Sequence, residues 1–498
     1  MYKLKLSPTI LSFIPVLVLI PLIQQLINDF HLGGMDLLND FLLSAVTPRI
    51  NNEIIINILQ RIGQTLYMAF MSWSLSILWG AIFGVLSSNL ICEILKFPNF
   101  FRKIIQLLLI LGRSIHELVW GIILIQIYGI NLSVGIISIC IPYTAINAKV
   151  ICEQIDNSNP KSVEALLQIS ANGFSSLITL LWKPILFTLR NFGLYRFECA
   201  LRSTTILGLF GLGGLGTSIF LSFQDLKFNE LWAYLWSLAL LISCSKVILN
   251  PENITKLNAK ISSFLILIIS CFFFYSVYFI LDFFLIEKGS WIYLTKNLLS
   301  FTINPNSLLK QTSETIILGV ISTGISVGLP PTLLFIFNDK LSLFCLQFLA
   351  FLFRLIHPSI LILILLMFNE PSISLAAITL GIHNASITLK LLITNLKQLD
   401  NAEYDALRYS GCLTRISWLY GLFSKQAKSY LAYCAYRSDI IFRETAVVGV
   451  MGSIGLGWQL RESLSSFAWG EVSIILMIYS SIAIMGEIFN AKIKANFI

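Results

Sequence analysis

The chain has 498 residues, of which 56% are hydrophobic and only 12% are charged, and its formal net charge is +8. A water-exposed domain carries about a quarter charged residues, so this composition excludes an ordinary soluble protein and predicts residence in a lipid bilayer. The Lys and Arg residues are scattered between apolar runs and form no dense basic stripe, which argues against nucleic acid as a partner.

The apolar runs are long enough to cross a bilayer, which takes about 20 helical residues. In chain order they predict about twelve transmembrane helices in two sets of six. The first set lies near residues 9–28, 64–88, 104–128, 132–150, 177–205 and 230–249, and the second near 261–286, 313–337, 341–368, 372–393, 418–446 and 470–489. The first run follows Lys3 and Lys5 as a signal sequence would, but no small-residue cleavage site comes after it, so we expect an uncleaved span.

The charged residues between the runs predict the orientation in the membrane. Basic residues such as Arg102, Lys256 and Lys397 fall in loops on one side, whereas Asp36 and Asp40 fall on the other. Loops rich in Lys and Arg face the cytoplasm. The protein is therefore predicted to be a multi-pass inner-membrane protein of a bacterial cell, with both termini cytoplasmic.

An internal repeat decides the predicted architecture. Arg113 and His116 recur 241 residues later as Arg354 and His357. The same offset relates Lys149 to Lys390, Tyr195 and Arg196 to Tyr436 and Arg437, Arg202 to Arg443, and Gly208, Gly211, Gly214 and Gly216 to Gly449, Gly452, Gly455 and Gly457. A constant offset over such a length indicates a duplication. We expect one unit over 1–255 (core 60–250) and another over 256–498 (core 310–490), which lie parallel because each has an even number of spans.

A polar, helix-prone stretch lies between the fourth and fifth spans of each half. An acidic residue, then Ala, then a small residue six places on suits a short helix with a small-residue stop. The residues concerned are Glu164, Ala165, Ser170 and Gly173 in the first half, and Asp405, Ala406 and Gly411 in the second.

This stretch resembles the EAA loop of ATP-binding-cassette importer permeases. The next part of the first half consists of Tyr195-Arg-Phe-Glu198, then Arg202, then the glycine-rich run from Leu207 to Gly216, and it is similar to the signature of the phosphonate-importer permeases. The resemblance covers both halves and implies an all-α, type I importer fold. It also implies two separate ATPase subunits docked on the EAA-type helices, a periplasmic binding protein, and a phosphonate, phosphite or phosphate as substrate.

The two halves differ from one another within this pattern, so their two ATPase contacts need not be equivalent. The matched pairs that differ are Ser170 and Gly411, Pro184 and Lys425, Gly213 and Ile454, and Glu198 and Asp439.

Each half has one Arg–His pair, which is predicted to lie near the middle of its third span. Arg113 and His116 are three residues apart and so would share one helical face, as would Arg354 and His357. An arginine at the bilayer centre costs about 2.5–3.5 kcal/mol, so these side chains should face the protein interior or a water-filled path. Either they line the route and attract an oxyanion, which Arg can grip with two hydrogen bonds, or they make structural contacts between helices, with Glu117 as a partner.

Glu198 and Arg202, like Asp439 and Arg443, are four residues apart and can pair along one helix. They either compensate charge inside a span or place Arg202 and Arg443 near the outer mouth of the path. Glycines come after each pair and permit close helix approach and irregular backbone, either as a gate or path lining or simply as packing. The glycines singled out are Gly211, Gly214, Gly452 and Gly455.

The sequence has no Gly-x-x-x-x-Gly-Lys-Ser/Thr loop, no His-Glu-x-x-His and no Cys-x-x-Cys among its nine cysteines. We therefore expect no enzymatic activity in this chain alone, no metal and no cofactor. The main alternative is an ion-coupled secondary transporter with two six-helix halves, which would need carboxylates inside the spans. Of Glu117, Glu198, Asp282 and Asp439, only Glu198 and Asp439 are duplicated.

Overall fold

The computed structural model describes residues 7–94, 98–156, 192–193, 195–248, 275, 278, 305–337, 340–452 and 454–497. Within these ranges the chain is helical, apart from turns and one isolated antiparallel bridge between Phe30 and Asn369, so the predicted all-α class is confirmed there. Outside the described residues lie the first-half coupling residues Glu164, Ala165, Ser170 and Gly173, Pro184, most of the predicted spans 177–205 and 261–286, and the predicted boundary at 255.

The chain forms two compact units. The first-half unit is Phe41–Leu298, and the second-half unit combines Met1–Asp40 with Leu299–Ile498. The N-terminal residues thus group with the second half, whereas the sequence repeat assigns them to the first.

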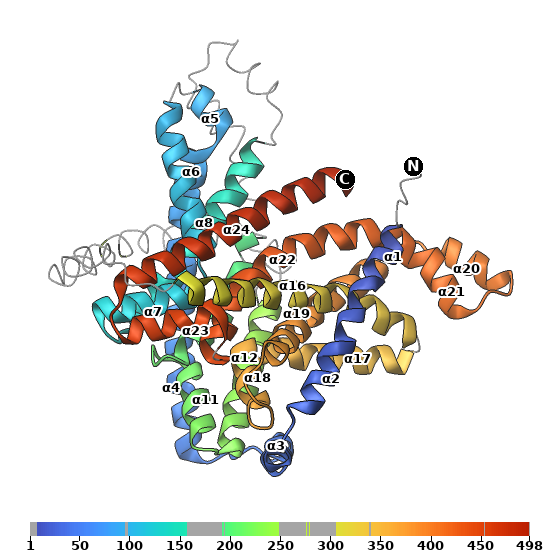
Figure 1. Ribbon diagram of the computed structural model, residues 1–498, viewed down its shortest axis with the longest axis horizontal. Helices are drawn as coiled ribbons and strands as arrows, with labels where there is room; N and C mark the ends of the chain where they lie inside the picture. The colour runs from blue at the N-terminus through green and yellow to red at the C-terminus, as the bar shows by residue number, and fades with distance from the viewer. Residues whose placement is uncertain are drawn as a thin grey trace, which may run out of the picture. The chain divides into compact units, whose positions relative to one another are not determined.

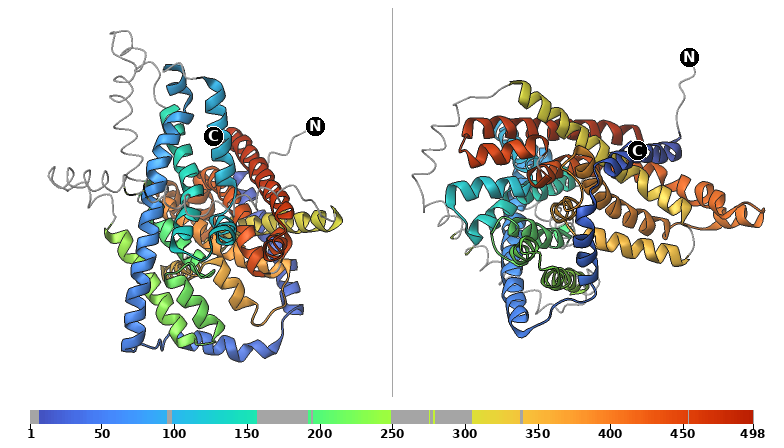
Figure 2. Two further views of the ribbon diagram at one scale, coloured as in Figure 1. Left: turned by 90° about the vertical axis from the view of Figure 1, so that its left-hand side faces the viewer. Right: turned by 60° about the horizontal axis from the view of Figure 1, so that its bottom comes forward.

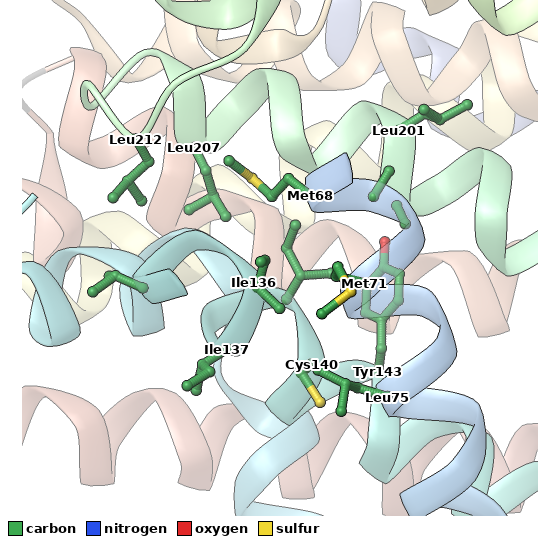
Figure 3. Close-up of a cluster of buried hydrophobic side chains, with 14 of the residues drawn as sticks. Met68, Met71, Leu75, Ile136, Ile137, Cys140, Tyr143, Leu201, Leu207 and Leu212 are labelled. Carbon is green, nitrogen blue, oxygen red and sulfur yellow. The ribbon is translucent and has the colours of Figure 1, made fainter. Parts of the chain in front are cut away.

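In the first-half unit, α4 and α8 run side by side and form the centre of the packing (Figures 1 and 2). A Cβ on Gly80 of α4 would lie 2.6 Å from the Cβ of Asn147, so small residues set this close approach. Figure 3 shows the core that they share, with Met71, Leu75 and Tyr143 among its members. The unit is entered through α3 (Met35–Ser44) and comprises α4 (Asn52–Ser87), α5 (Asn89–Ile94), α6 (Asn99–Ser114), α7 (Glu117–Tyr128), α8 (Leu132–Asp156), helical residues 195–208, α11 (Leu215–Gln224) and α12 (Phe228–Ile248).

The second-half unit is built around α16, α19 and α22, which pack against one another. Its helices are α16 (Pro305–Ile336), α17 (Lys340–Leu355), α18 (Pro358–Leu365), α19 (Ile373–Leu396), α20 (Ala402–Tyr409), α21 (Thr414–Trp418), the π-helical turn η3 (Leu419–Phe423), α22 (Ser424–Gly452), α23 (Gly455–Ser465) and α24 (Trp469–Phe497).

The first predicted span packs on this unit. It is divided into α1 (Pro8–Phe13), the 3₁₀ turn η1 (Ile14–Val18) and α2 (Leu19–Asn28), and a 3₁₀ turn η2 (Leu32–Gly34) comes next. A Cβ on Gly328 of α16 would lie 2.3 Å from the backbone nitrogen of Val16, so the glycine admits η1 into direct backbone contact. Ser374 donates a hydrogen bond to Gln25 at 2.5 Å, and the Asn369 amide donates one to the carbonyl of Leu26 at 2.9 Å.

Six helical segments in the described part of the chain are long and apolar enough to cross a membrane, or nine if each of three bent helix pairs counts as one span. The six are Pro8–Asn28, Asn52–Ser87, Leu132–Asp156, Pro305–Ile336, Ile373–Leu396 and Trp469–Phe489. Each overlaps a predicted span. The helix α12 covers the predicted span at 230–249 but is not one of the six.

The prediction of one continuous third span in each half is wrong. The axes of α6 and α7 are bent by 93° and those of α17 and α18 by 95°. Arg113 and Arg354 lie in the last turn before the break, whereas His116 and His357 cap the helix after it. The predicted common helical face therefore does not exist, because the backbone at Ile115 and His116 is extended.

Matching hydrogen bonds recur in the two units. The Thr65 hydroxyl accepts the amide hydrogen of Leu215 at 2.9 Å, and Thr315 accepts that of Leu456 at 2.9 Å. Leu456 lies 241 residues after Leu215, but Thr315 lies 250 residues after Thr65. The second half is thus nine residues shorter between its first core helix and its broken helix, in the region where the first half has α5.

Candidate functional site

Histidine caps the second helix of each broken pair. The Nδ1 atom of His116 accepts the backbone amide hydrogen of Leu118 at 3.2 Å, and Nδ1 of His357 accepts that of Ser359 at 3.3 Å. The first amides of a helix lack partners within it, so such a side chain stabilises the new helix start. Both predicted path histidines therefore have a structural task at the break.

A third histidine satisfies the end of the preceding helix in the second-half unit. Nδ1 of the buried His383 lies 2.9 Å from the carbonyl oxygen of Phe353 and 3.2 Å from that of Ile356, at the end of α17. Since carbonyls only accept, Nδ1 carries a hydrogen. The ring centroids of His383 and His357 are 5.8 Å apart, so the two imidazoles bracket the break.

A buried polar chain lies beside the break in the first-half unit. Ser203 donates to Glu117 at 2.6 Å, and the Tyr143 hydroxyl lies 2.9 Å from the Ser203 oxygen. Because Ser203 has a single hydrogen, Tyr143 is the donor of the second bond. The guanidinium carbon of the buried Arg196 lies 5.0 Å from the centre of the Tyr143 ring, within reach of a cation–π interaction. Nε2 of His116 is 3.5 Å from the other oxygen of Glu117.

The second-half unit has a buried network of three side chains. Nε of Arg437 donates to the Asn384 oxygen at 2.7 Å, and its Nη2 lies 3.3 Å from Glu444. The Asn384 amide in turn donates to the other oxygen of Glu444 at 2.8 Å, which closes the triangle. All three residues are buried. Breaking such a buried ion pair from one side costs about 3–5 kcal/mol, because the remaining charge stays in an apolar interior. Sequence reasoning did not assign this network.

The predicted intrahelical pairs are present. Nη2 of Arg202 lies 2.7 Å from Glu198, and Arg443 pairs with Asp439 in the same way. The second pair is the more buried, with side chains 13% and 12% exposed against 27% and 21% in the first. Charge compensation within a helix is therefore realised in both units, and a path contact would have to compete with it.

The glycine-rich runs form tight breaks between helices, and the axes on the two sides of the second break are bent by 58°. Gly214 and Gly455 have φ of +80° and +59° at the start of α11 and α23. A Cβ on Gly216 would lie 2.1 Å from the carbonyl oxygen of Thr205, so only glycine fits. Of the other two glycines singled out, Gly211 has φ of +83°, and a Cβ on Gly452 would meet Ile362 at 2.4 Å. Gly213 has φ of +98°, whereas the matched Ile454 is extended, which explains how the second half tolerates a side chain there.

The second-half coupling stretch forms the short helix α20, at one end of its unit with α21 (Figure 1). Asp405, Ala406 and Gly411 are all exposed, and α20 buries none of its residues. Gly411 has φ of +85° and ends the helix, as predicted. Tyr409 is 91% exposed and Leu413 is 70% exposed. The result is a small, partly apolar surface whose apolar side chains have no cover within the unit.

The opposite side of α20 is fixed to η3. A Cβ on Gly421 would lie 2.8 Å from both Cα and N of Tyr404, so the backbones of α20 and η3 touch at this glycine. Nζ of Lys425 lies 3.0 Å from a carboxylate oxygen of Glu403. Since η3 continues directly into α22, these contacts connect α20 to the start of that long helix.

Comparison with known proteins gives relatives of one kind. The chain is 19% identical to the phosphate-import permease protein PhnE of Mycolicibacterium smegmatis, over 78% of this chain and 76% of the relative. It is 27% identical to the putative phosphite transport system permease protein HtxE of Stutzerimonas stutzeri over 24% of this chain and 46% of that protein. It is 24% identical to the phosphite transport system permease protein PtxC of the same organism, over 24% of this chain and 44% of PtxC. No protein-family model and no solved structure matches.

The resemblance inferred from the motifs is thereby confirmed. The curated relatives are phosphonate, phosphite and phosphate transport permeases, and the long match to PhnE extends over most of both chains. The chain thus shares sequence with transport permeases and has helices long and apolar enough to cross a membrane, as a multi-pass membrane protein has.

Proposed function

We propose that this chain, a relative of phosphorus-oxyanion permeases, is the complete membrane path of an ATP-driven importer for phosphonate, phosphite or phosphate. Its halves act as two parallel six-helix repeats in one chain, with both termini in the cytoplasm and about twelve spans in all. The observation that carries the proposal is the long match to a phosphate-import permease, and the short helix Ala402–Tyr409, which buries none of its residues, supports it.

Energy enters this importer through the cytoplasmic helices. The exposed residues Asp405, Ala406 and Tyr409 of α20 dock in a groove of one ATPase subunit. The stretch with Glu164 and Ala165 serves a second subunit in the same way. Closure of the ATPase pair pushes α20 against η3 and so moves α22, because the backbone contact at Gly421 leaves no slack.

The path itself is lined by residues near the two Arg–His breaks and the two glycine breaks. Arg113 and Arg354 lie in the last turn of the helix before each break. Irregular backbone at membrane depth is tolerated beside protein or water. Arg202 and Arg443 serve as oxyanion contacts nearer the outer mouth, where substrate competes with Glu198 and Asp439. The helix breaks at Gly211, Gly214, Gly452 and Gly455 form the gate. A periplasmic binding protein supplies the substrate.

The test is co-purification in mild detergent of the tagged chain with the ATP-binding subunits of its own cell, followed by native mass measurement. Two ATPase subunits per chain are expected, and Tyr409→Ala should lower their recovery. Phe489→Ala is the matched control, since Phe489 is also an exposed aromatic of the same unit, at 63%, but lies on α24. Recovery of the chain without any ATPase subunit, with solute uptake driven by an ion gradient, would make it a secondary transporter.

A further inference from the structure

The two buried arginines lie at matched positions of the two halves, but the acidic residues near them do not. Arg437 lies 241 residues after Arg196, and Asn384 lies 241 residues after Tyr143. Each arginine meets its matched partner, Arg196 over the Tyr143 ring and Arg437 at the Asn384 oxygen. The buried arginine and its first contact have therefore been retained in both halves, although the chemistry of that contact differs.

The acidic residue of this network lies on a different helix in each half. In the first half it is Glu117, the first residue of α7, and the position matching Glu444 is Ser203. In the second half it is Glu444 on α22, and the position matching Glu117 is Pro358. Each half thus has one acidic residue at these two matched positions. It is at the first position in the first half (Glu117) and at the second position in the second half (Glu444).

Both carboxylates connect to the matched positions Tyr143 and Asn384, Glu444 directly and Glu117 through Ser203. Glu444 binds Arg437 and Asn384 directly. Glu117 accepts from Ser203, which accepts from Tyr143, and the Tyr143 ring lies under Arg196. Ser203 therefore fills, with a hydroxyl, the place that a carboxylate occupies in the other half. A buried guanidinium in a membrane interior needs a compensating negative charge, and either helix can supply it.

We propose that Glu117 and Glu444 are equivalent positioning residues that hold the buried arginines Arg196 and Arg437, and that the acidic residue can be moved between its two positions without loss. Neither carboxylate is a proton-coupling group under this proposal, because its requirement is a negative charge within the polar network of the buried arginine. The uptake readout rests on the proposed importer function, whereas the stability readout does not.

The experiment moves the charge within the first half of the full-length chain. Glu117→Gln is expected to lower the melting temperature in detergent by about 5–10 °C and to reduce uptake at least tenfold. Adding Ser203→Glu should restore most of both, because the carboxylate then takes the place that Glu444 has in the other half. Adding Ser203→Gln instead is the matched control, with similar size and no charge, and should restore neither.

The mirror experiment in the second half starts from Glu444→Gln and adds Pro358→Glu, with Pro358→Gln as its control. Glutamate suits this position, since it is the first residue of α18 and faces the positive end of the helix dipole. The proposal is overturned if the relocated glutamates restore stability no better than the glutamine controls. If the unaltered chain takes up no phosphorus oxyanion, the importer function fails, but the melting comparison still decides the equivalence of the two carboxylates.

Discussion

Substituting Gly421 tests whether the contact between α20 and η3 transmits force. The new Cβ of Gly421→Ala would lie 2.8 Å from two backbone atoms of Tyr404 and 3.2 Å from the carbonyl carbon of Glu403. Non-bonded carbon atoms prefer about 3.5–4.0 Å, so α20 has to withdraw by roughly 1 Å. Overpacking of this kind costs about 1–3 kcal/mol, and the better helix propensity of alanine returns up to about 1 kcal/mol.

The net cost of about 1 kcal/mol lowers the equilibrium constant for docking of α20 on η3 about fivefold. We expect ATP-dependent uptake in proteoliposomes to fall by up to about this factor. The melting temperature of the chain should change by less than about 2 °C, since α20 buries none of its residues. Gly63→Ala in α4 is the control, because a Cβ there meets nothing within 4 Å. Uptake at the wild-type level in Gly421→Ala, or an equal loss in Gly63→Ala, would refute the reasoning.

Three further outcomes are expected. Thr315→Val removes the hydrogen bond to the Leu456 amide and should cost about 1 kcal/mol of stability in a melting assay, whereas Thr315→Ser should cost much less. Tyr409→Ala should leave the melting temperature unchanged, because the side chain is 91% exposed, and a clear fall would mean that α20 is packed elsewhere. Asp439→Asn removes the charge that balances Arg443 and should destabilise the chain by about 1–3 kcal/mol; altered uptake with unchanged stability would instead assign Arg443 to the substrate path.

The features that the sequence predicted correctly are those with a local or periodic signal. Glu198 and Arg202 are four residues apart on one helix, so their pairing results from helix geometry alone. Gly411 ends α20 because only a residue that tolerates positive φ can come after that helix with this geometry. The six apolar helices overlap predicted spans because hydropathy is summed over many residues.

The helix breaks were missed because two extended residues inside a continuous apolar run hardly change its average hydropathy. In the second half, the sequence contained one indication of the helix break. Pro358 directly follows His357, and proline is favoured at the first position of a helix, so this pair indicates a helix start rather than a helix interior. In the first half Glu117 at the same position gives a weaker indication of the same kind.

The buried networks could not be predicted, since they join residues far apart in sequence. Asn384 lies 60 residues from Glu444, and Tyr143 lies 60 residues from Ser203. A fixed offset of 241 aligns these positions but shows an unlike residue at each, so the repeat alone gave no reason to connect them. Only the contacts in the folded chain show that each half has an acidic residue in the network around its buried arginine.

The central claim, that this chain is the membrane path of an ATP-driven importer, is tested most directly by reconstitution. The chain would be placed in proteoliposomes with its co-purifying ATPase subunits and binding protein, and uptake of labelled phosphonate, phosphite and phosphate would be measured with ATP or with an ion gradient alone. The account predicts uptake of at least one of these oxyanions that requires ATP hydrolysis and is lowered by Gly421→Ala. Uptake driven by the ion gradient without ATP would contradict it.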